Sequence, residues 1–510
     1  MKRALISVSD KSGVADFAAG LVALGFTIIS TGGTSKLLRQ SGVDTTEVES
    51  LTGFPEMMDG RLKTLHPSVH GGLLMRPDEP EDRAAAEANG ISPIEILCVN
   101  LYPFAATVAG EHTLDQAIEN IDIGGPAMLR SAAKNHRYVT VVTSPTQYGQ
   151  VLHEISEKGT TSGKLRRELA VSAFFHTAHY DGLISQYFHQ AFGLKEMPSE
   201  MGLPMRKVSD LRYGENPHQP ASFYQTGVPS GGLASARVLQ GKELSYCNIN
   251  DADTAWRLAS EFGQPAAVAV KHATPCGVAL GDSPLQAYQK AYDADPVSIF
   301  GGIVALNRPV DAATAEVMSA IFLDVIVAPE FSEEAQEVFA RKKNLRLLAM
   351  GTQPTRSLLP EWNVHSVQGG FLLQTPDELE SPEAWQVASQ RVPTAGEWED
   401  LHFAWTVVKY VKSNAIVIAK GGRTLGIGTG QTNRRDATLQ ALLGAGERAR
   451  GAVMASDAFF PMPDSIDFAA RAGVTAVVHP GGSLRDADSL SVADEAEMAV
   501  ALTGSRHFRH

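Results

Sequence analysis

The first 195 residues alternate between short apolar runs and longer segments whose apolar residues recur at helical spacing. Such runs are typical of buried strands, and such segments are typical of amphipathic helices. The expected strands are Ala4–Val8, Phe26–Ser30, Ile94–Val99 and Tyr138–Val142. The expected helices are Gly13–Leu24, Ser35–Gln40, Leu114–Glu119, Met128–Ala133 and Leu165–Phe192. This alternation predicts a mostly parallel sheet covered by helices.

A turn-rich segment, Lys195–Pro204, follows this region, and we interpret it as an interdomain linker. We therefore expect two domains, residues 1–197 and 198–510. The second region alternates again and contains a faint internal repeat. The paired stretches are Ala266–Lys271 with Ala415–Lys420, Val297–Gly302 with Met454–Phe460, and Val325–Pro329 with Ala476–Pro480. The repeat predicts two similar α/β lobes.

Composition narrows the class of protein. Among the 510 residues, 44% are hydrophobic and 20% are charged, as in an ordinary globular protein with a large core. The net charge of −13 argues against sequence-independent binding to nucleic acid or to anionic membranes. The three cysteines form no C-x-x-C pair, which excludes a disulfide framework and fits a reducing cytoplasm. We expect no membrane span and a cytoplasmic location.

Two turns in the first domain combine hydroxyl groups with glycine or lysine. Ser7–Lys11 follows the first expected strand, and Thr31–Thr34 follows the second. Backbone N–H groups at a helix start, together with hydroxyls, can bind phosphate. Either turn could instead be a simple helix cap.

Further polar residues stand in loops and at helix ends of the same domain. Those with hydrogen-bonding or charged groups are Arg61, Lys63, Thr64, Asn100, Tyr102, Asp122, Lys134 and His136. Residues that directly follow a strand are where α/β sheets place ligand contacts. The basic loop could equally be solvated, and Lys134 could be a favourable cation at a helix C-terminus.

In the second region an apolar run, Val268–Val270, ends in the adjacent cations Lys271 and His272. A buried strand gains nothing from them, whereas a site that moves a proton and stabilises negative charge can use both. Zinc deaminases carry the pattern H-x-E…P-C-x-x-C. Here Thr274 stands where the glutamate is required, and no second cysteine follows Cys276 at that spacing. Zinc is therefore disfavoured.

Other constellations in the second region suggest contacts to a phosphate or an aromatic ring. They include Arg212 with Tyr213, Asn414, Arg434 with Arg435, Phe459, and the basic stretch from Arg506 to His510. Arginine can hold a phosphate through two hydrogen bonds. The glycines at 426, 428 and 430 lack the G-x-G-x-x-G spacing of a dinucleotide site. The last stretch is either a disordered tail or a strap over a pocket.

In their order along the chain, these motifs closely resemble one family, the bifunctional purine biosynthesis protein AICAR transformylase/IMP cyclohydrolase. The resemblance covers essentially the whole chain. It rests on Arg-x-Lys-Thr-Leu-His-Pro, Asn-Leu-Tyr-Pro-Phe, Ile-Asp-Ile-Gly-Gly, Ala-Lys-Asn-His, Leu-Arg-Tyr-Gly-x-Asn-Pro-His-Gln, Lys-His-x-x-Pro and Ser-Asp-Ala-Phe-Phe-Pro.

The resemblance implies a fold and two reactions. It implies an N-terminal methylglyoxal-synthase-like parallel-sheet domain and a C-terminal, two-lobed, cytidine-deaminase-like domain without zinc. The second domain would transfer a formyl group from 10-formyltetrahydrofolate, a co-substrate, to AICAR. The first would close the product, FAICAR, to IMP. No catalytic metal is implied, and the family works as a homodimer with the transformylase pocket between subunits.

Matching motif by motif assigns residues to each site. The implied catalytic residues are Lys271 and His272 for transfer, and Lys134, Asp122, Tyr102 and Lys63 for closure. Implied nucleotide contacts for closure are Ser9, Asp10, Lys11, Thr31, Gly32, Gly33, Thr34, Arg61, Thr64, Val99, Asn100, Asp122 and Ile123. Implied AICAR contacts for transfer are Arg212, Tyr213, Gly301, Asp324, Asn414, Arg434, Asp464 and Arg506. Implied folate contacts are Arg435 and Phe459.

Two other functions compete with this interpretation. The first domain could be a phosphate-eliminating lyase of the methylglyoxal-synthase type. The chain could also be a nucleotide-sensing module without turnover. Many members of the family have Asn where Thr274 stands and Phe where Met462 stands, which affects pocket detail only.

Overall fold

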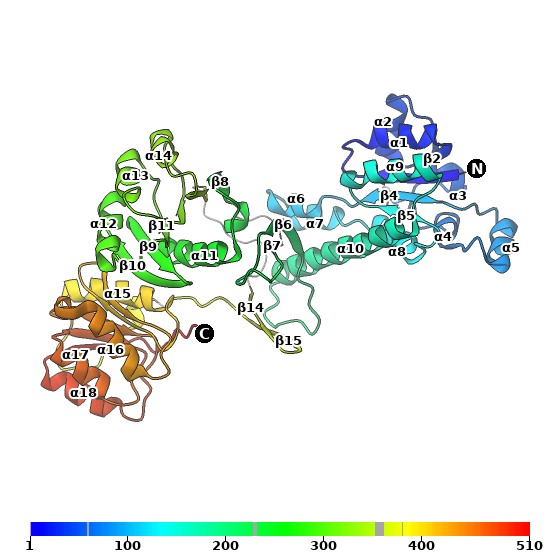
Figure 1. The fold of residues 1–510 in the computed structure, drawn as a ribbon. Coiled ribbons are helices and arrows are strands. Elements are labelled where there is room, and N and C mark those ends of the chain that lie inside the picture. The colour runs from blue at the N-terminus through cyan, green and yellow to red at the C-terminus, as the bar shows by residue number, and fades with distance from the viewer. Residues whose placement is uncertain (1, 59–60, 228–231, 352–361, 380) are drawn as a thin grey trace. The chain divides into compact units, whose positions relative to one another are not determined.

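The computed structural model describes residues 2–58, 61–227, 232–351, 362–379 and 381–510, and it divides into two compact units (Figure 1). The first unit comprises mainly residues up to Arg206. The second contains Lys207–Gln225 and most of the chain after residue 230. No helix within these described ranges is long and apolar enough to cross a membrane.

The first unit is built on a five-stranded parallel sheet with strand order β3-β2-β1-β4-β5. The strands are β1 (Lys2–Val8), β2 (Phe26–Ser30), β3 (Thr45–Glu47), β4 (Ile96–Asn100) and β5 (Thr140–Val142). The expected parallel sheet is confirmed. The two later strands begin two residues after the expected positions, and β3 is too short and polar to give an apolar signal.

Helices pack against the apolar side chains of this sheet. They are α1 (Val14–Ala23), α2 (Gly32–Gln40), α3 (Val48–Thr52), α4 (Pro67–Leu74), α5 (Pro80–Ala88), α6 (Phe104–Ala109), α7 (Leu114–Glu119), α8 (Gly124–Lys134), α9 (Tyr148–Lys158) and α10 (Gly163–Ala191). The strand residues Leu5, Ile28 and Leu97 are fully buried in the core. The carboxyl ends of β1, β2 and β4 therefore open together at one edge of a rigid sheet.

The turn-rich segment after α10 folds back along that helix. Gln186 Nε2 donates to the carbonyl of Gly202 at 2.8 Å, and His189 Nε2 lies 2.8 Å from the carbonyl oxygen of Glu196. A Cβ on Gly182 would lie 3.4 Å from Pro204. This segment, interpreted from its turn residues as an interdomain linker, is thus packed against the first unit.

The second unit contains two six-stranded mixed sheets with the same strand order. The first is β10-β9-β11-β12-β13-β8, and the second is β18-β17-β19-β20-β21-β16. In each, the first two neighbouring pairs are antiparallel, the next two are parallel and the last is antiparallel. We call the two sheets with their helices the first lobe and the second lobe.

The elements of the second unit follow the repeat. The first lobe has β8 (Arg237–Gln240), α11 (Tyr246–Ser260), β9 (Ala266–Lys271), β10 (Thr274–Leu280), α12 (Pro284–Ala294), β11 (Ile303–Leu306), α13 (Ala312–Met318), β12 (Val325–Ala328), α14 (Glu333–Phe339) and β13 (Arg346–Ala349). The second has β16 (Gln386–Val387), α15 (Ala395–Val408), β17 (Ile416–Ala419), β18 (Thr424–Gly428), α16 (Arg434–Ala445), β19 (Val453–Ser456), α17 (Asp464–Arg471), β20 (Ala476–His479), α18 (Asp486–Glu495) and β21 (Ala499–Leu502). Two hairpins complete the unit, β6 (Met205–Leu211) with β7 (Ala221–Thr226) and β14 (Asn363–Val367) with β15 (Gly370–Gln374).

The repeat corrects one expected pairing. Val297–Gly302 precedes β11, whereas Met454 lies inside β19, so the strand equivalent to β19 is β11 itself. The other two pairings coincide with β9 and β17, and with β12 and β20.

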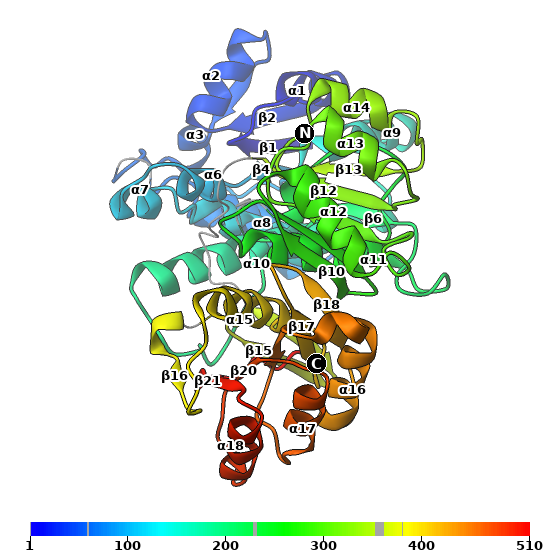
Figure 2. The same ribbon diagram turned by 90° about the vertical axis from the view of Figure 1, so that its left-hand side faces the viewer.

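The lobes share a core. Apolar residues of α11 and α15 pack between the two sheets, while α12–α14 and α16–α18 cover the other faces (Figure 2). The edge strands β10 and β18 run antiparallel beside each other, with Ala279 bridged to Arg423 and the Leu280 N–H donating to the Gly422 carbonyl at 2.8 Å. This register directs the β9–β10 turn towards the carboxyl end of β18.

Candidate functional site

In the first unit, the turns after β1 and β2 are bonded to each other. The hydroxyls of Ser7 and Thr31 lie 2.7 Å apart. The Thr34 hydroxyl accepts from the Val8 N–H at 3.2 Å and donates to the Val8 carbonyl at 3.0 Å. The Lys11 ammonium donates to the same carbonyl at 3.0 Å. These bonds form one rigid, hydroxyl-rich surface at the sheet edge.

Asn100, at the end of β4, fixes the first of these turns. Its Oδ1 accepts the N–H groups of Ser9 and Asp10 at 2.6 and 2.8 Å, and its Nδ2 donates to the Asp10 carbonyl at 3.0 Å. In the structure this side chain therefore stabilises the turn, whereas the motif match predicted a contact to the nucleotide.

Two lysines flank the first turn of α2. A Cβ on Gly32 would lie 3.2 Å from Lys63 Nζ, and one on Gly33 would lie 4.0 Å from Lys11 Nζ. Free N–H groups at a helix start, two cations and the lack of side chains suit a bound anion. Two carboxylates pair with the basic loop, Glu56 with Lys63 and Glu119 with Arg61.

Asp122 and Tyr102 form a second, less polar part of this site. Burial raises the pKa of Asp122, and hydrogen bonds from the Gly125 and Tyr102 backbones oppose that rise. Burial also raises the pKa of Tyr102, helped by the charges of Asp122 and Glu56. The Tyr180 hydroxyl accepts the Asp122 N–H at 2.9 Å. Tyr102 thus stays a protonated donor at neutral pH.

The start of α8 approaches the basic loop closely. A side chain on Gly124 would collide with the Thr64 hydroxyl, so the Ile123–Gly125 turn must be small there. Lys134 is exposed in the last turn of the same helix. The helix has eleven residues, so ten steps of about 1.5 Å separate Gly124 from Lys134 by about 15 Å. The structure brings Lys11, Lys63, Tyr102 and Asp122 together, but not Lys134.

In the second unit, Lys271 and His272 lie at the tip of a hairpin. Lys271 pairs with Thr274 across the β9–β10 turn, which leaves only His272 and Ala273 between the strands. His272 is exposed, and Lys271 Nζ donates to the Phe300 carbonyl at 2.6 Å. Gly301 follows, and a Cβ there would lie 3.9 Å from the same ammonium. Lys271 and Gly301 therefore belong to one site.

Asp324, just before β12, lies at the same edge of this sheet. Its carboxylate accepts from Arg346 Nη1 and from Asn248 Nδ2, each at 2.6 Å. Lys271, Gly301, Asp324 and Arg346 thus stand around the amino ends of β11, β12 and β13.

The second-lobe residues gather at the opposite ends of the equivalent strands. Arg434 opens α16 and is buried against Asp457, which follows β19, and it donates to the Ala415 carbonyl at 3.0 Å. Burial lowers the pKa of Arg434, and Asp457 opposes that change. Asn414 Nδ2 donates to the Gln431 carbonyl at 2.8 Å. Arg434 is thus buried, and its bonds connect α16 to the segments around Ala415 and Asp457.

The remaining second-lobe residues are more open. Arg435 lies over the ring of Phe468, Phe459 is 39% exposed, and Asp464 begins α17. Arg506, after β21, lies over Phe508. The residues beyond it are ordered, because the His507 N–H donates to the Asp457 carbonyl at 3.0 Å and Arg509 reaches Thr254 of α11.

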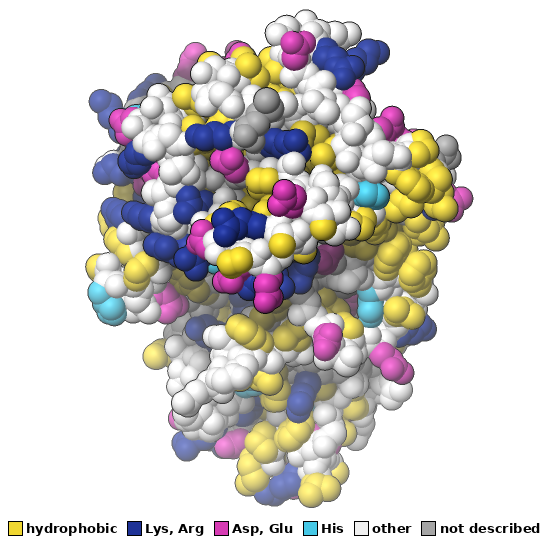
Figure 3. Space-filling model, turned by 90° about the vertical axis from the view of Figure 1, so that its right-hand side faces the viewer, with side chains coloured by type: hydrophobic (Ala, Val, Ile, Leu, Met, Phe, Trp, Pro, Cys, Tyr) yellow, Lys and Arg dark blue, Asp and Glu magenta, His cyan; other side chains and the backbone are white. Residues whose placement is uncertain are grey.

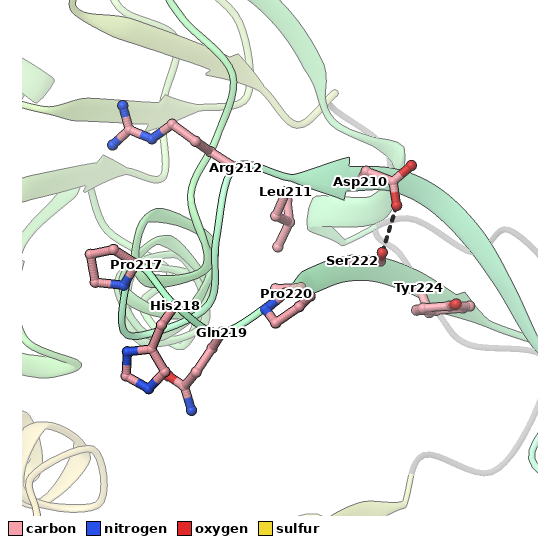
Figure 4. Close-up of a pocket in the computed structure, with 10 residues that line it drawn as sticks. Asp210, Leu211, Arg212, Pro217, His218, Gln219, Pro220, Ser222 and Tyr224 are labelled. Carbon is pink, nitrogen blue, oxygen red and sulfur yellow. Dashed lines mark hydrogen bonds between the residues drawn. The ribbon is translucent and has the colours of Figure 1, made fainter.

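Arg212 lines a pocket of about 580 Å³ beside the β6–β7 hairpin (Figure 4). Arg212 donates to the Tyr213 hydroxyl at 2.5 Å and lies over the Tyr213 ring. Cys247 stands at the start of α11, and burial raises the pKa of its thiol, as do the charges of Asp251 and Glu215. Glu215 is three residues after Arg212 in the same loop, so this loop lies near the start of α11.

Comparison with known proteins gives these clusters a context. A family model described as "AICARFT/IMPCHase bienzyme" matches residues 132–443, more than half of the chain, and one described as "MGS-like domain" matches residues 13–127. The chain belongs to the AICARFT/IMPCHase bienzyme family. The resemblance drawn from the motifs, and the methylglyoxal-synthase-like character of the N-terminal domain, are thereby confirmed.

Full-length relatives of this bienzyme chain carry the name "Bifunctional purine biosynthesis protein PurH". Those of Bacillus subtilis (strain 168) and Thermoanaerobacter sp. (strain X514) are each 52% identical, over 513 and 511 residues, with 100% of both chains covered. A solved structure titled "Crystal structure of ForH" is 36% identical and covers 36% of this chain and 97% of its own. Its TM-score is 0.33.

Sequence reasoning missed several residues that organise the two sites of the bienzyme. They are Glu56, Tyr180, Asn248, Asp251, Arg346 and Asp457. All but Asp457 stand outside the motifs. Glu56 pairs with Lys63 seven positions away, and each of the others acts through a partner at least 22 positions away. Only Asp457 carried a local signal, because it lies within Ser-Asp-Ala-Phe-Phe-Pro.

Proposed function

We propose that the two reactions of this bienzyme are divided between its two units. As a family member the chain is a bifunctional enzyme, a phosphoribosylaminoimidazolecarboxamide formyltransferase and IMP cyclohydrolase, which catalyses the last two steps of IMP synthesis. The proposal assigns ring closure to the first unit and formyl transfer from 10-formyltetrahydrofolate to the second. The observation that carries it is that two separate polar clusters stand on two separate cores.

For formyl transfer, the nucleophile is the 5-amine of AICAR, whose lone pair is delocalised into the ring. His272 removes a proton as this nitrogen forms its bond to the formyl carbon. The ammonium of Lys271 stabilises the developing oxyanion and then protonates the folate nitrogen as the carbon–nitrogen bond breaks. The lysine contact at the Phe300 carbonyl supports this role, because it holds the ammonium beside the hairpin tip.

For ring closure, the carboxamide nitrogen of FAICAR attacks the new formyl carbon and water leaves. Tyr102 donates to the formyl oxygen, which its raised pKa supports. Asp122 accepts from the amide and orients it. Lys11 and Lys63, beside the start of α2, hold the phosphate together with the N–H groups at that helix start and the Thr31 hydroxyl. The Thr34 hydroxyl is already bonded to the Val8 backbone and holds the turn in shape. Lys134 is proposed as the proton carrier on the family match alone, since α8 separates it from Asp122.

We also propose the domain boundaries 1–197 and 198–510, with a cytidine-deaminase-like fold in each lobe that works without a metal. The repeated strand order supports the two-lobed description. Burial raises the pKa of the Cys276 thiol to about 12, which disfavours the thiolate that zinc requires.

The proposed partners are small molecules only, AICAR, FAICAR and the folate, together with a second copy in a cytoplasmic homodimer. Binding to nucleic acid or to membranes is not expected. The net charge of −13 supports this, as do the interspersed basic and acidic side chains on the face in Figure 3.

Product analysis tests the division of labour. The purified chain with AICAR and 10-formyltetrahydrofolate should form FAICAR and then IMP. Asp122→Asn should accumulate FAICAR, and His272→Ala should form FAICAR at least about 10²-fold more slowly while still closing added FAICAR. If one variant loses both activities while remaining folded, the sites are not separate. A fragment of residues 1–198 that closes FAICAR would support the boundary.

A further inference from the structure

The turn that carries His272 has an unusual backbone. His272 and Ala273 have φ values of 54° and 55°, in the left-handed region. Two-residue hairpin turns of type I′ need positive φ at both positions, and they normally use Asn-Gly or Gly-Gly to reach it. Neither residue here is glycine, so the turn is strained unless the surroundings hold it.

A carboxylate from a different element holds this turn. Asp251, on α11, accepts the Ala273 N–H at 2.6 Å through Oδ1. The backbone of His272 also hydrogen-bonds to Asp251, and its imidazole is close enough to interact with the charge. Burial raises the pKa of Asp251, and these backbone bonds oppose the rise.

The helix that carries Asp251 is itself held at its start and along its buried face. Ser245 and Asn248 cap its start reciprocally, and Asn248 also bonds to Asp324. Ala252 and Ala255 are fully buried in the core that the two lobes share. Asp251 is thus presented from a rigid element to the backbone of the turn.

The second lobe contains the same arrangement without the strain. Asp400 stands six residues after the N-cap of α15, as Asp251 does in α11. Its two carboxylate oxygens accept the N–H groups of Gly421 and Gly422 at 2.9 and 2.8 Å. These glycines have φ values of 62° and 64°, the conformation of His272 and Ala273. The clamp is common to both lobes, but only the first lobe replaces glycine with histidine.

We infer that Asp251 is a positioning residue for formyl transfer, because its carboxylate holds the His272–Ala273 backbone in the left-handed turn that sets His272 at the hairpin tip. This inference rests on the proposed role of His272. Asp251 itself touches no reacting atom in this scheme.

The test measures both activities of the full-length chain. Asp251→Ala should lower kcat for formyl transfer by about 10²-fold, as expected for a misplaced catalytic group, with the KM for AICAR changed by less than about threefold. Asp251→Asn keeps an acceptor oxygen and should lose about tenfold less. Closure of added FAICAR should not change. The matched control, Asp400→Ala, should stay within about threefold because its glycines need no clamp.

Relief of strain supplies the decisive measurement. Ala273→Gly in the Asp251→Ala background should recover formyl transfer at least about fivefold, because glycine adopts positive φ freely. The inference is overturned if Asp251→Ala transfers normally, if only KM changes, or if glycine recovers nothing in a protein whose thermal unfolding is unaltered. His272→Ala is measured in parallel. Normal transfer by that variant would instead overturn the proposed function.

Discussion

The two lobes of the second unit have the same architecture, but their candidate site residues stand at opposite ends of the equivalent strands. In the first lobe, Gly301, Asp324 and Arg346 stand at the amino ends of the parallel strands. In the second, Asp457 and Arg506 follow the carboxyl ends. Because β10 and β18 run antiparallel where the lobes join, these opposite ends lie at the same edge of the joined sheets. A repeat can thus supply two different residue sets to one side of the molecule.

The largest expected difference concerns the ion pair in each lobe. The Arg434–Asp457 side chains are 5% and 0% exposed, whereas Arg346 and Asp324 are 10% and 35% exposed. Asp457→Ala leaves a buried unpaired charge and should cost about 3–5 kcal/mol of unfolding free energy. Asp324→Ala should cost clearly less. Urea unfolding of both variants measures this, and equal losses would show that burial does not distinguish the pairs.

The hairpin tips should differ next. His272→Ala should lower formyl transfer by at least about 10²-fold, the lower end for loss of a general base. Gly421→Ala changes the equivalent turn in the second lobe and should cost some stability because of its φ of 62°, with transfer within about threefold. Initial rates with saturating AICAR compare them. A loss of transfer in Gly421→Ala as large as in His272→Ala would contradict the division.

The capping residues of α11 and α15 should give the two lobes a different dependence of stability on pH. Asn248 cannot titrate, but its equivalent Glu397 has a pKa of about 2, because hydrogen bonds from Arg391, Thr475 and Thr394 outweigh the effect of burial. A pKa below the ordinary 4.5 gives stability that is complete above pH 4.5 and lost as pH falls towards 2. Glu397→Gln should therefore destabilise the chain at pH 7 by on the order of 2 kcal/mol, and progressively less below pH 4.5.

Urea midpoints at pH 7 and pH 3 provide the comparison. Asp436→Asn, at an exposed cap of α16, is a suitable control for the loss of a carboxylate. A Glu397→Gln effect that is the same at both pH values would show that the carboxylate charge is not responsible.

The smallest effect is expected at Cys276. Its raised pKa keeps it a thiol, so Cys276→Ala and incubation with a chelator should each leave formyl transfer within about twofold. Metal analysis accompanies the assay. Stoichiometric zinc, lost together with activity on chelation, would contradict a metal-free mechanism.

The sequence predicted what local patterns encode. The parallel sheet follows from apolar runs such as Phe26–Ser30, which has the expected bounds. The turn at His272 could not be predicted, because neither His nor Ala is a turn residue and the stabilising Asp251 lies 22 positions away. The position of Lys134 could not be predicted either. A motif match shows which residue type stands there, but it does not show how far that residue lies from Asp122. Contacts between distant segments, rather than propensity, decide these details.

The apolar layer of α11 and α15 between the two sheets has a consequence for how the repeat can evolve. The core between the sheets contains side chains of both lobes, for example Leu258 of α11 in the first lobe and Leu401 of α15 in the second. A lobe expressed alone would expose this surface to water and aggregate. The second unit should therefore melt in one cooperative transition. Duplicated halves joined in this way can no longer be exchanged between proteins one at a time.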